Sequence, residues 1–385
     1  MIRFRMKKIK TAGYDMAKMK KTETDIRKQF RRGVLTLLTL SVAALIGAAA
    51  LVIYIDPFFH YHSPLPGFPY LIDNQLSQNP GMAQHLDYDS VILGSSMTFN
   101  FQTTWFRELM DLNTIKLCYS AAYPKDQANI MELIFQNHSH AEGNDLDTVF
   151  LGIDVFTYTA GIEETKYPIP DYLYDDHLLN DVNYIWNKDV ILNYILRPIA
   201  DPEPTDLSNV YASWWTEEYY NKDYVLRNYV SPEQVAEETD PEVYLQAVER
   251  NLTSNICPYI EQNPRTKFVI FFPPYSILFW DRVLKENHLE ATIEEYRYIA
   301  NRLNAYDNVE VYFFPDREEI VCNLDNYADY THYHPRYNRY MTECFVSGEN
   351  LVAKPGEPGK TIDEYLAHMK ELAINFPYEE LLSGQ

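Results

Sequence analysis

The sequence predicts an α/β protein with a five-stranded parallel sheet between layers of helices, preceded by one membrane-spanning helix. Three observations predict this: five short apolar runs recur along the chain, helical patterns separate most of them, and an uncharged apolar run covers residues 33–55. Strands that alternate with helices indicate βαβ units. Nearly continuous apolar strands indicate a sheet that is covered on both faces.

Each expected element follows from a local pattern. The predicted strands are "SVILG" (90–94), "TIKLCY" (114–119), "TVFLGI" (148–153), "KFVIFF" (267–272) and "NVEVYFF" (308–314). Apolar residues at helical spacing predict helices over 103–110, 127–137, 241–262 and 289–304. Strands and helices alternate along most of the chain, which is typical of a three-layer sandwich.

One long segment interrupts this alternation. Residues 155–240 are rich in Tyr, Trp, Asp and Pro and contain few apolar runs, which predicts an insertion in the main domain. Because the segment follows the third strand, one interpretation places it at the carboxyl edge of the sheet, over a ligand crevice. The other interpretation is a packing elaboration without a role in ligand binding.

The C-terminal segment 353–385 is predicted to be a linker followed by a helix. "AKPGEPGK" (353–360) has linker composition, and Thr361 with Glu364 matches the Ser/Thr-x-x-Glu capping box that begins a helix. The main domain is therefore expected to cover residues 56–352.

Charge and hydropathy predict how the chain meets a membrane. The first 33 residues contain 12 Lys and Arg against Asp15, Glu23 and Asp25, a net charge of +9. The uncharged run that follows would span about 35 Å as a helix, enough to cross a hydrocarbon core of about 30 Å. Because basic flanks stay in the cytoplasm, residues 1–32 are expected inside, 33–55 in the membrane and the rest outside. A cleaved signal peptide and a buried core helix are the alternatives.

The remainder of the chain is strongly acidic. The net charge of the whole chain is −22, which leaves −31 beyond the basic N-terminus. This charge argues against binding to nucleic acid or to an anionic bilayer. No cofactor is predicted. Of the four cysteines, Cys118 is expected to be a buried thiol, and Cys322 with Cys344 is the one pair considered for a disulfide.

Small polar residues follow the first strand at the edge where a parallel sheet binds ligands. Gly94-Ser95-Ser96 ends the first strand and leads into a helical pattern, so a serine there lies near free backbone N–H groups. A serine nucleophile needs a histidine base that a carboxylate orients. "DYTHYHP" supplies Asp329 and His332 after the fifth strand, at the same expected edge.

This arrangement resembles the SGNH/GDSL hydrolase superfamily. Within it, the chain is similar to the membrane-anchored branch that includes the D-alanyl-lipoteichoic acid biosynthesis protein and alginate acetylation factors. The likeness covers about residues 56–345 and rests on the N-terminal anchor, "DPFFHYHSP", "NQLSQNPGMAQHLDYDSVILGSSM" and "DYTHYHP". It implies a flavodoxin-like sheet and ester or acyl-transfer chemistry on a cell-envelope polymer such as teichoic acid or an exopolysaccharide.

The resemblance also implies roles for single residues. Ser96 matches the nucleophile, and Asp329 and His332 match the other members of the triad. Gly94 precedes the nucleophile as in the family. In the second family block "YSAAY" (119–123) puts Ala122 near the position of a backbone oxyanion donor.

The third family block departs from its usual Gly-x-Asn-Asp. Here Asp154 stands at the asparagine position, in Gly152-Ile153-Asp154-Val155. An ionised carboxylate would repel an oxyanion, so Asp154 is expected either to be protonated or to hold a backbone turn.

Two further segments are candidates for substrate contact. "FFPPYS" (271–276), with Pro273 and Tyr275, is expected to form a groove wall at the end of the fourth strand. His334, followed by proline, is expected to shape its loop or to touch the substrate.

Other functions were weighed against acyl transfer. A metal site is one alternative, because the sequence contains three His-x-His pairs: His60/His62, His138/His140 and His332/His334. No carboxylate completes a ligand set around any of them. The second alternative is a non-catalytic partner that presents an SGNH-like domain to a membrane-bound O-acyltransferase. The preferred prediction is a membrane-anchored serine esterase or O-acyltransferase that works with such a partner.

Overall fold

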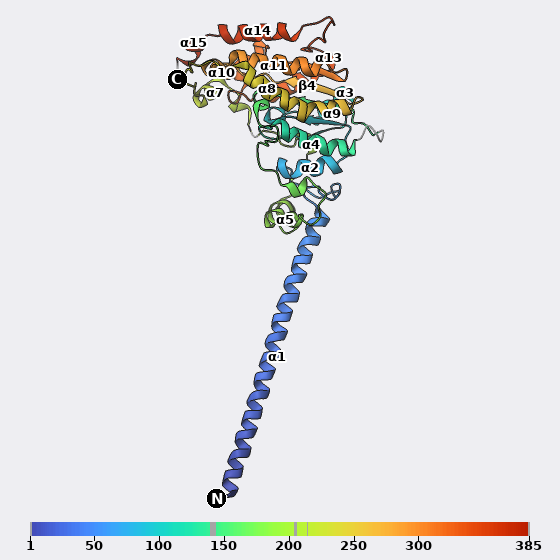
Figure 1. Cartoon of the computed structure of the whole chain (residues 1–385), viewed down its shortest axis with the longest axis vertical. Coiled ribbons are helices and arrows are strands. Elements are labelled where there is room, and N and C mark those ends of the chain that lie inside the picture. The colour runs from blue at the N-terminus through green and yellow to red at the C-terminus, as the bar shows by residue number, and fades with distance from the viewer. Residues whose placement is uncertain (1, 139–143, 204–205, 214, 384–385) are drawn as a thin grey trace.

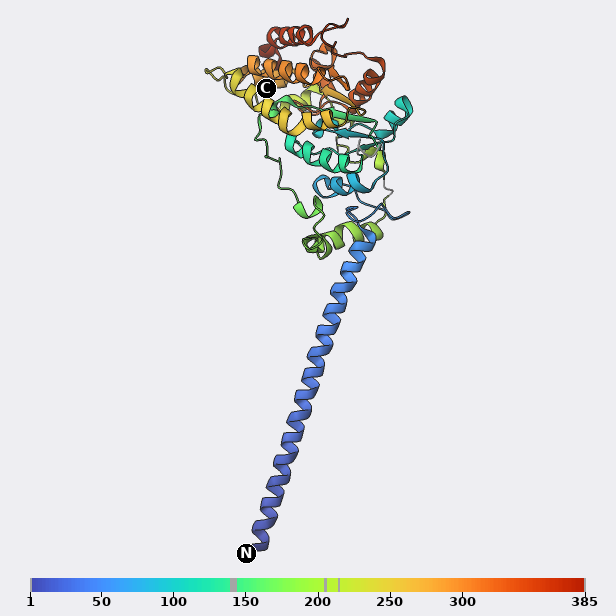
Figure 2. The same cartoon turned by 45° about the vertical axis from the view of Figure 1, so that its right-hand side comes forward.

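The structure is a computed structural model that describes residues 2–138, 144–203, 206–213 and 215–383. It shows an α/β domain at the end of one long N-terminal helix, α1 (Ile2–Ile55), which extends away from the domain (Figures 1 and 2). Within α1, the segment Met19–Ile55 contains an 18-residue stretch with a mean hydropathy of 2.4, so the helix is long and apolar enough to cross a membrane.

The described residues of the domain form five strands and a series of helices. The strands are β1 (Ser90–Leu93), β2 (Thr114–Lys116), β3 (Thr148–Gly152), β4 (Lys267–Phe272) and β5 (Val309–Phe313). The α-helices after α1 are α2 (Gln75–His85), α3 (Thr103–Met110), α4 (Pro124–Asn137), α5 (Val182–Ile185), α6 (Arg197–Ala200), α7 (Lys222–Asn228), α8 (Pro241–Asn251), α9 (Cys257–Gln262), α10 (Ile277–Lys285), α11 (Leu289–Asn304), α12 (Glu318–Val321), α13 (Pro335–Ser347), α14 (Ile362–Asn375) and α15 (Tyr378–Leu382).

All five strands pair in parallel, in the order β2-β1-β3-β4-β5. Val91 in β1 lies between Ile115 in β2 and Val149 in β3. The chain leaves β1 toward one edge of the sheet and later returns to β3 on the other side of β1. The strand order therefore reverses between β1 and β3, and a crevice forms at the carboxyl ends of strands at such a point.

Helices cover both faces of the sheet. Right-handed crossovers place α3 on one face and α4, α8 and α11 on the other, because the chain moves in opposite directions after β1 and after β2. The packing agrees: α3 contacts α13, and α8 contacts α11. Strands β1 and β3 are buried along their whole length, as their nearly continuous apolar sequences predict.

Each predicted strand and helix corresponds to an observed one, with bounds that differ by up to three residues and with one helix interrupted. Strand β2 ends at Lys116 rather than residue 119, although the N–H groups of Leu117 and Tyr119 still donate to Ile92 O at 2.9 Å and to Gly94 O at 3.1 Å. The helix predicted over 241–262 is interrupted by a π-helical segment, η8 (Leu252–Ile256). Pro258 explains the interruption, because proline has no N–H for the ladder and its ring clashes with the preceding turn.

The chain directly after α1 is organised around the buried carboxylate of Asp56. This carboxylate accepts hydrogen bonds from the backbone N–H groups of His60, Tyr61 and His62, at 2.7–3.0 Å, and from the Tyr184 hydroxyl at 2.8 Å. Tyr184 belongs to α5, so one part of the 155–240 insertion is fixed to the end of α1.

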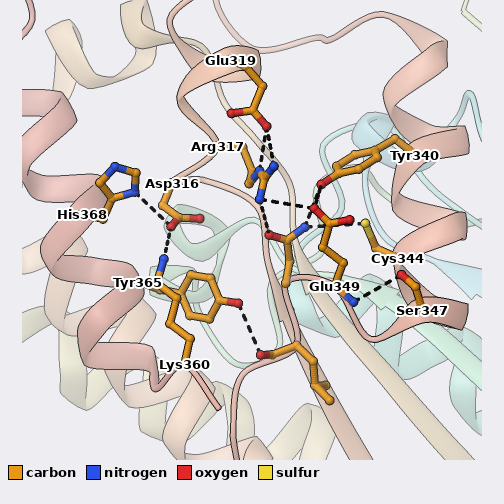
Figure 3. Close-up of polar contacts among 12 residues, drawn as sticks. Asp316, Arg317, Glu319, Tyr340, Cys344, Ser347, Glu349, Lys360, Tyr365 and His368 are labelled. Carbon is orange, nitrogen blue, oxygen red and sulfur yellow. Dashed lines mark hydrogen bonds and ion pairs between the residues drawn. The ribbon is translucent and has the colours of Figure 1, made fainter.

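The C-terminal segment is fixed to the domain at the end of β5 (Figure 3). Asp316 is 4% exposed and accepts a hydrogen bond from Lys360 Nζ at 2.5 Å, and it lies 3.2 Å from His368 Nδ1. Beside it Arg317 pairs with Glu319 at 2.6 Å and with Glu349 at 3.4 Å. The Thr361–Glu364 capping box begins α14 as predicted, and α14 packs on α11.

The four cysteines are unpaired in the structure, so the disulfide considered for Cys322 and Cys344 is not formed. Cys118 is fully buried, as its apolar surroundings in the sequence predict.

Candidate active site

The Gly94-Ser95-Ser96 segment makes a tight turn between β1 and a 3-10 turn, η1 (Ser96–Thr98). Gly94 has a φ of +141°, and a Cβ there would lie 2.6 Å from Thr98 Cγ2 and 3.1 Å from Gly152 O. Only glycine fits this position without strain. The Ser95 hydroxyl caps the turn by accepting from Met97 N at 3.2 Å. Ser96 thus begins the turn at the carboxyl end of β1.

The structure brings Ser96, His332 and Asp329 into one hydrogen-bonded chain. The Ser96 Oγ lies 2.8 Å from His332 Nε2, and His332 Nδ1 lies 2.7 Å from Asp329 Oδ2. These are the contacts that the sequence predicts for a serine, its base and the carboxylate that orients the base. The site is open to solvent, because the side chains of His332 and Asp329 remain 24% and 33% exposed.

Asp329 is held in its ionised form by its own loop. Its Oδ1 accepts the backbone N–H groups of Thr331 and His332, both at 2.7 Å, and the Thr331 hydroxyl at 3.0 Å. Burial raises the pKa of this carboxyl, but the hydrogen bonds and the charge of His332 outweigh burial and lower the pKa to about 2. One oxygen therefore shapes the turn while the other faces the imidazole.

A second set of contacts ties the histidine loop to the serine turn. The Tyr333 hydroxyl donates to Met97 O at 2.7 Å, and Asn338 Nδ2 donates to the same carbonyl at 3.2 Å. Tyr333 and Asn338 are both buried. Because Met97 follows Ser96 directly, these bonds fix the distance between the hydroxyl and the imidazole. Neither residue could be identified from the sequence, since a tyrosine next to a histidine carries no recognisable motif.

Asp154 follows the carboxyl end of β3 and lies beside the turn that carries Ser95 and Ser96. Its side chain is 3% exposed and accepts hydrogen bonds from the Tyr275 hydroxyl and from Ser95. Burial raises the pKa of Asp154 to about 6, although the bond from Ser95 and the charge of His332 oppose the rise. The side chain of Asp154 caps no turn of its own, and it connects the segments after β1 and β4 through Ser95 and Tyr275.

Ala122 is buried and is not connected to the triad by any described contact. Its N–H donates to Tyr119 O at 3.4 Å, within its own turn. The N–H of Ser96 is better placed to hold an oxyanion, because Ser96 is the first residue of η1 and such N–H groups have no carbonyl partner within the turn.

The groove wall predicted at 273–276 is wrong. All four residues are buried, and Tyr275 is only 1% exposed. Their polar groups are used internally: Pro274 O accepts from Tyr327, and the Ser276 hydroxyl donates to Tyr330 O at 2.6 Å. The strand position suggested exposure, but the loop that carries His332 covers this segment. Pro273 and Tyr275 support the site from beneath and do not face the solvent.

The insertion contributes to the site through residues 215–220. The ring of Trp215 lies against the imidazole of His332, with centroids 4.9 Å apart. Glu217 contacts His334 Nε2 at 2.9 Å, and Tyr220 packs against the His334 ring. His334 also accepts from Arg336 N at 3.0 Å and so caps α13. His334 therefore shapes its loop, and this part of the insertion covers the carboxyl edge.

The remaining histidines of the His-x-His pairs have partners other than a metal set. His60 lies 3.4 Å from Asp181, His62 Nε2 lies 3.1 Å from Ile53 O, and His138 packs on Tyr88. His140 lies outside the described residues. Across the ranges that the structure describes, no three metal-ligating side chains gather.

Comparison of the chain with models of protein families, with curated proteins and with solved structures finds no match.

Proposed function

We propose that this protein is a membrane-anchored serine esterase or O-acyltransferase of the SGNH type, acting on a hydroxyl-bearing polymer of the cell envelope. The observation that carries the proposal is the Ser96–His332–Asp329 chain, with contacts of 2.8 and 2.7 Å between the successive side chains. The strand order β2-β1-β3-β4-β5, which is that of flavodoxin-like sheets, also supports it. The solvent-open site suits a segment of a long polymer better than an enclosed small molecule.

In the first half of the reaction, Ser96 Oγ attacks the carbonyl carbon of an acyl ester. His332 Nε2 takes the hydroxyl proton, and Asp329 stabilises the imidazolium that forms. The negative charge moves to the carbonyl oxygen, where the N–H of Ser96 donates to it. The ester C–O bond then breaks, His332 returns the proton to the departing alcohol, and the acyl group remains on Ser96.

In the second half, His332 removes a proton from a polymer hydroxyl or from water. The resulting oxygen attacks the acyl-serine carbonyl, and Ser96 leaves with the proton that His332 returns. A polymer hydroxyl gives transfer and water gives hydrolysis. Both outcomes use the same residues.

Asp154 acts here as a positioning residue. Its carboxyl receives hydrogen bonds from Ser95, next to the nucleophile, and from Tyr275. It therefore holds the nucleophile turn against the loop after β4, in place of the donor that the family usually has there.

The second candidate is a non-catalytic partner of a membrane-bound O-acyltransferase. Two observations favour it: Ala122 N–H is bonded within its own turn, and a carboxyl group stands where an oxyanion donor is usual. Both features weaken the oxyanion site.

The anchor is part of the proposal. We infer that residues 33–55 cross the membrane with residues 1–32 in the cytoplasm and the domain outside, because the basic N-terminus precedes the uncharged run.

A fluorophosphonate probe tests the catalytic proposal on the full-length protein in detergent. Wild type should form a covalent adduct on Ser96, and Ser96→Ala should form none. Ser347→Ala is the matched control, because Ser347 is an exposed serine at the end of α13, and it should react as wild type does. An unreactive wild type, together with full polymer acylation in cells that carry Ser96→Ala, would select the non-catalytic partner.

A further inference from the structure

We propose that residues 178–200 of the insertion form a second membrane contact, which lies in the outer leaflet beside α1 and takes lipid acyl chains as its partner. The proposal goes beyond the catalytic function and rests on the membrane anchor proposed above. The segment contains α5, the π-helical η5 (Val190–Leu196) and α6. Figures 1 and 2 both show α5 and its neighbours beside the domain end of α1.

The helical part of this segment begins with the exposed ion pair of Lys188 and Asp189 and is then mostly apolar. The apolar part is "VILNYILRPIA" (190–200), in which only Asn193 and Arg197 are strongly polar. A helix of this kind is normally buried inside a protein or in a membrane. Something must therefore cover each of its faces.

The domain covers one face. Val190, Ile195 and Pro198 are buried, and Ile195 is fully so. The π-helical turn precedes Pro198, whose missing N–H relaxes the regular ladder. This face fixes the orientation of the segment on the protein.

The opposite face is uncovered. Leu192, Leu196 and Ile199 are 53%, 47% and 55% exposed. Their spacing of four and three residues places them on one side of a helix. Leu178 and Leu179, before α5, are 74% and 92% exposed. Exposed leucines at this density mark a surface that meets an apolar partner.

The position of Trp186 identifies the partner as lipid. Its Nε1 donates to Leu45 O of α1 at 3.0 Å, while half of the ring remains exposed. Leu45 precedes the end of α1 by ten residues, or about 15 Å of helix. The run 33–55 is only about 5 Å longer than the hydrocarbon core. Leu45 is therefore close to the midpoint of the run, and Trp186 lies near the middle of the bilayer, at the inner limit of the outer leaflet, whenever residues 33–55 span the membrane.

The surroundings fit a segment that enters the outer leaflet beside α1. The same stretch of α1 exposes Leu45, Ile46 and Ile53 to the outside, so its lipid-facing surface continues directly onto the insertion. Arg197 lies beside Leu196 and can extend toward headgroup phosphates while its stem stays on apolar surface.

Depth-dependent quenching in vesicles tests the proposal with the full chain. Single cysteines are introduced at Leu196, at Leu40 in the span and at Val346 on α13, each in a Cys322→Ala background, because the other three native cysteines are buried. All three positions carry exposed aliphatic side chains, so the labels should not disturb folding. Each site carries an environment-sensitive NBD label. The vesicles contain phosphatidylcholine and phosphatidylglycerol with nitroxides on the acyl chains.

We expect the labels at Leu40 and Leu196 to be quenched and shifted to the blue, and the label at Val346 to be unaffected. If the label at Leu40 is quenched while the label at Leu196 behaves like that at Val346, the anchor is supported and the lipid contact is overturned. The exposed face with Leu192, Leu196 and Ile199 would then be a surface for a protein partner. If neither Leu40 nor Leu196 is quenched, the anchor itself is wrong and the lipid contact fails with it. Labelling of Ser96 by a fluorophosphonate, measured on the same samples, reports the catalytic proposal separately.

Discussion

The Tyr333 hydroxyl donates to the carbonyl of Met97 at 2.7 Å and joins two segments that lie 236 residues apart in the chain. Tyr333 follows His332, and Met97 follows Ser96. The bond therefore sets how closely the base approaches the hydroxyl, without touching either reacting atom.

Removing this bond should slow the reaction more than it destabilises the fold. Tyr333→Phe loses one hydrogen bond, worth about 1 kcal/mol. If the transition state loses that stabilisation, the rate should fall roughly fivefold. Because Asn338 still donates to Met97 O, the melting temperature should change little. We expect kcat for a small activated ester to fall while KM stays constant. Tyr337→Phe on α13 is the control, and an equal loss there would remove the positioning role.

Asp329→Asn should reduce the rate of covalent labelling by about four orders of magnitude, as loss of the orienting carboxylate does in serine hydrolases. The control is Asp325→Asn, four residues earlier, whose carboxylate accepts the backbone N–H of Lys222 at 2.8 Å and lies outside the triad. Stopped-flow labelling with a fluorophosphonate measures both. Similar rates in the two variants would contradict the triad.

The pH dependence of stability should reveal the buried Asp154. Its pKa is about 6 in the folded protein and is raised by burial, so the folded state binds the proton more tightly than the unfolded chain does. The resulting stabilisation is complete below about pH 4 and is lost as the pH rises through 6, a change of about 3 kcal/mol. In Asp154→Asn this loss should be absent.

The measurement is the melting temperature of wild type and Asp154→Asn between pH 4 and pH 8. As the pH rises, the melting temperature of the variant should increase relative to that of wild type. The variant should still react with the fluorophosphonate. A difference that does not vary with pH would mean that Asp154 is ionised throughout.

Gly94→Ala should lower the free energy of unfolding by about 1–3 kcal/mol from backbone strain alone, because a φ of +141° is strained for any residue with a Cβ. The added methyl would also meet Thr98 Cγ2 at 2.6 Å. Adding Thr98→Ser removes that methyl group and should restore part of the loss, while the strain in φ remains. Thermal melting of the single and double variants checks this, and a fully stable Gly94→Ala would show that the turn can relax.

The orientation of the chain can be tested in intact cells. A cysteine at Ser347 should react with a membrane-impermeant maleimide added outside, and wild type should react weakly, since three of its cysteines are buried. Labelling that appears only after lysis would place the domain in the cytoplasm.

Local patterns predicted what depends on neighbours in the sequence. The bounds of α3 and α11 match their apolar stripes, and Thr361 with Glu364 forms the predicted capping box. The serine and the Asp-x-x-His segment were recognised because each is a short motif at the end of a strand.

Contacts between distant segments could not be predicted in this way. Trp215 on His332, Tyr275 on Asp154 and Tyr333 on Met97 each join residues whose own surroundings look ordinary. Strand position suggested that 273–276 faces a groove, but burial depends on which loop lies above it. The helix over 241–262 was predicted without a break, although Pro258 is a local signal for the π-helical segment that precedes it. The side on which α9 packs has no such local signal.

The junction between α1 and the domain has a consequence for where the protein can work. The last carbonyls of α1 are held by the domain itself: Ile53 O by His62, at 3.1 Å, and Ile55 O by the Tyr70 hydroxyl, at 2.8 Å. Asp56 then turns the chain without a flexible spacer. With α1 across the bilayer, Ser96 would keep a constant working height above the lipid surface. If the protein is the enzyme proposed above, its active site cannot move away from the membrane. Another component would then have to bring the polymer to that height.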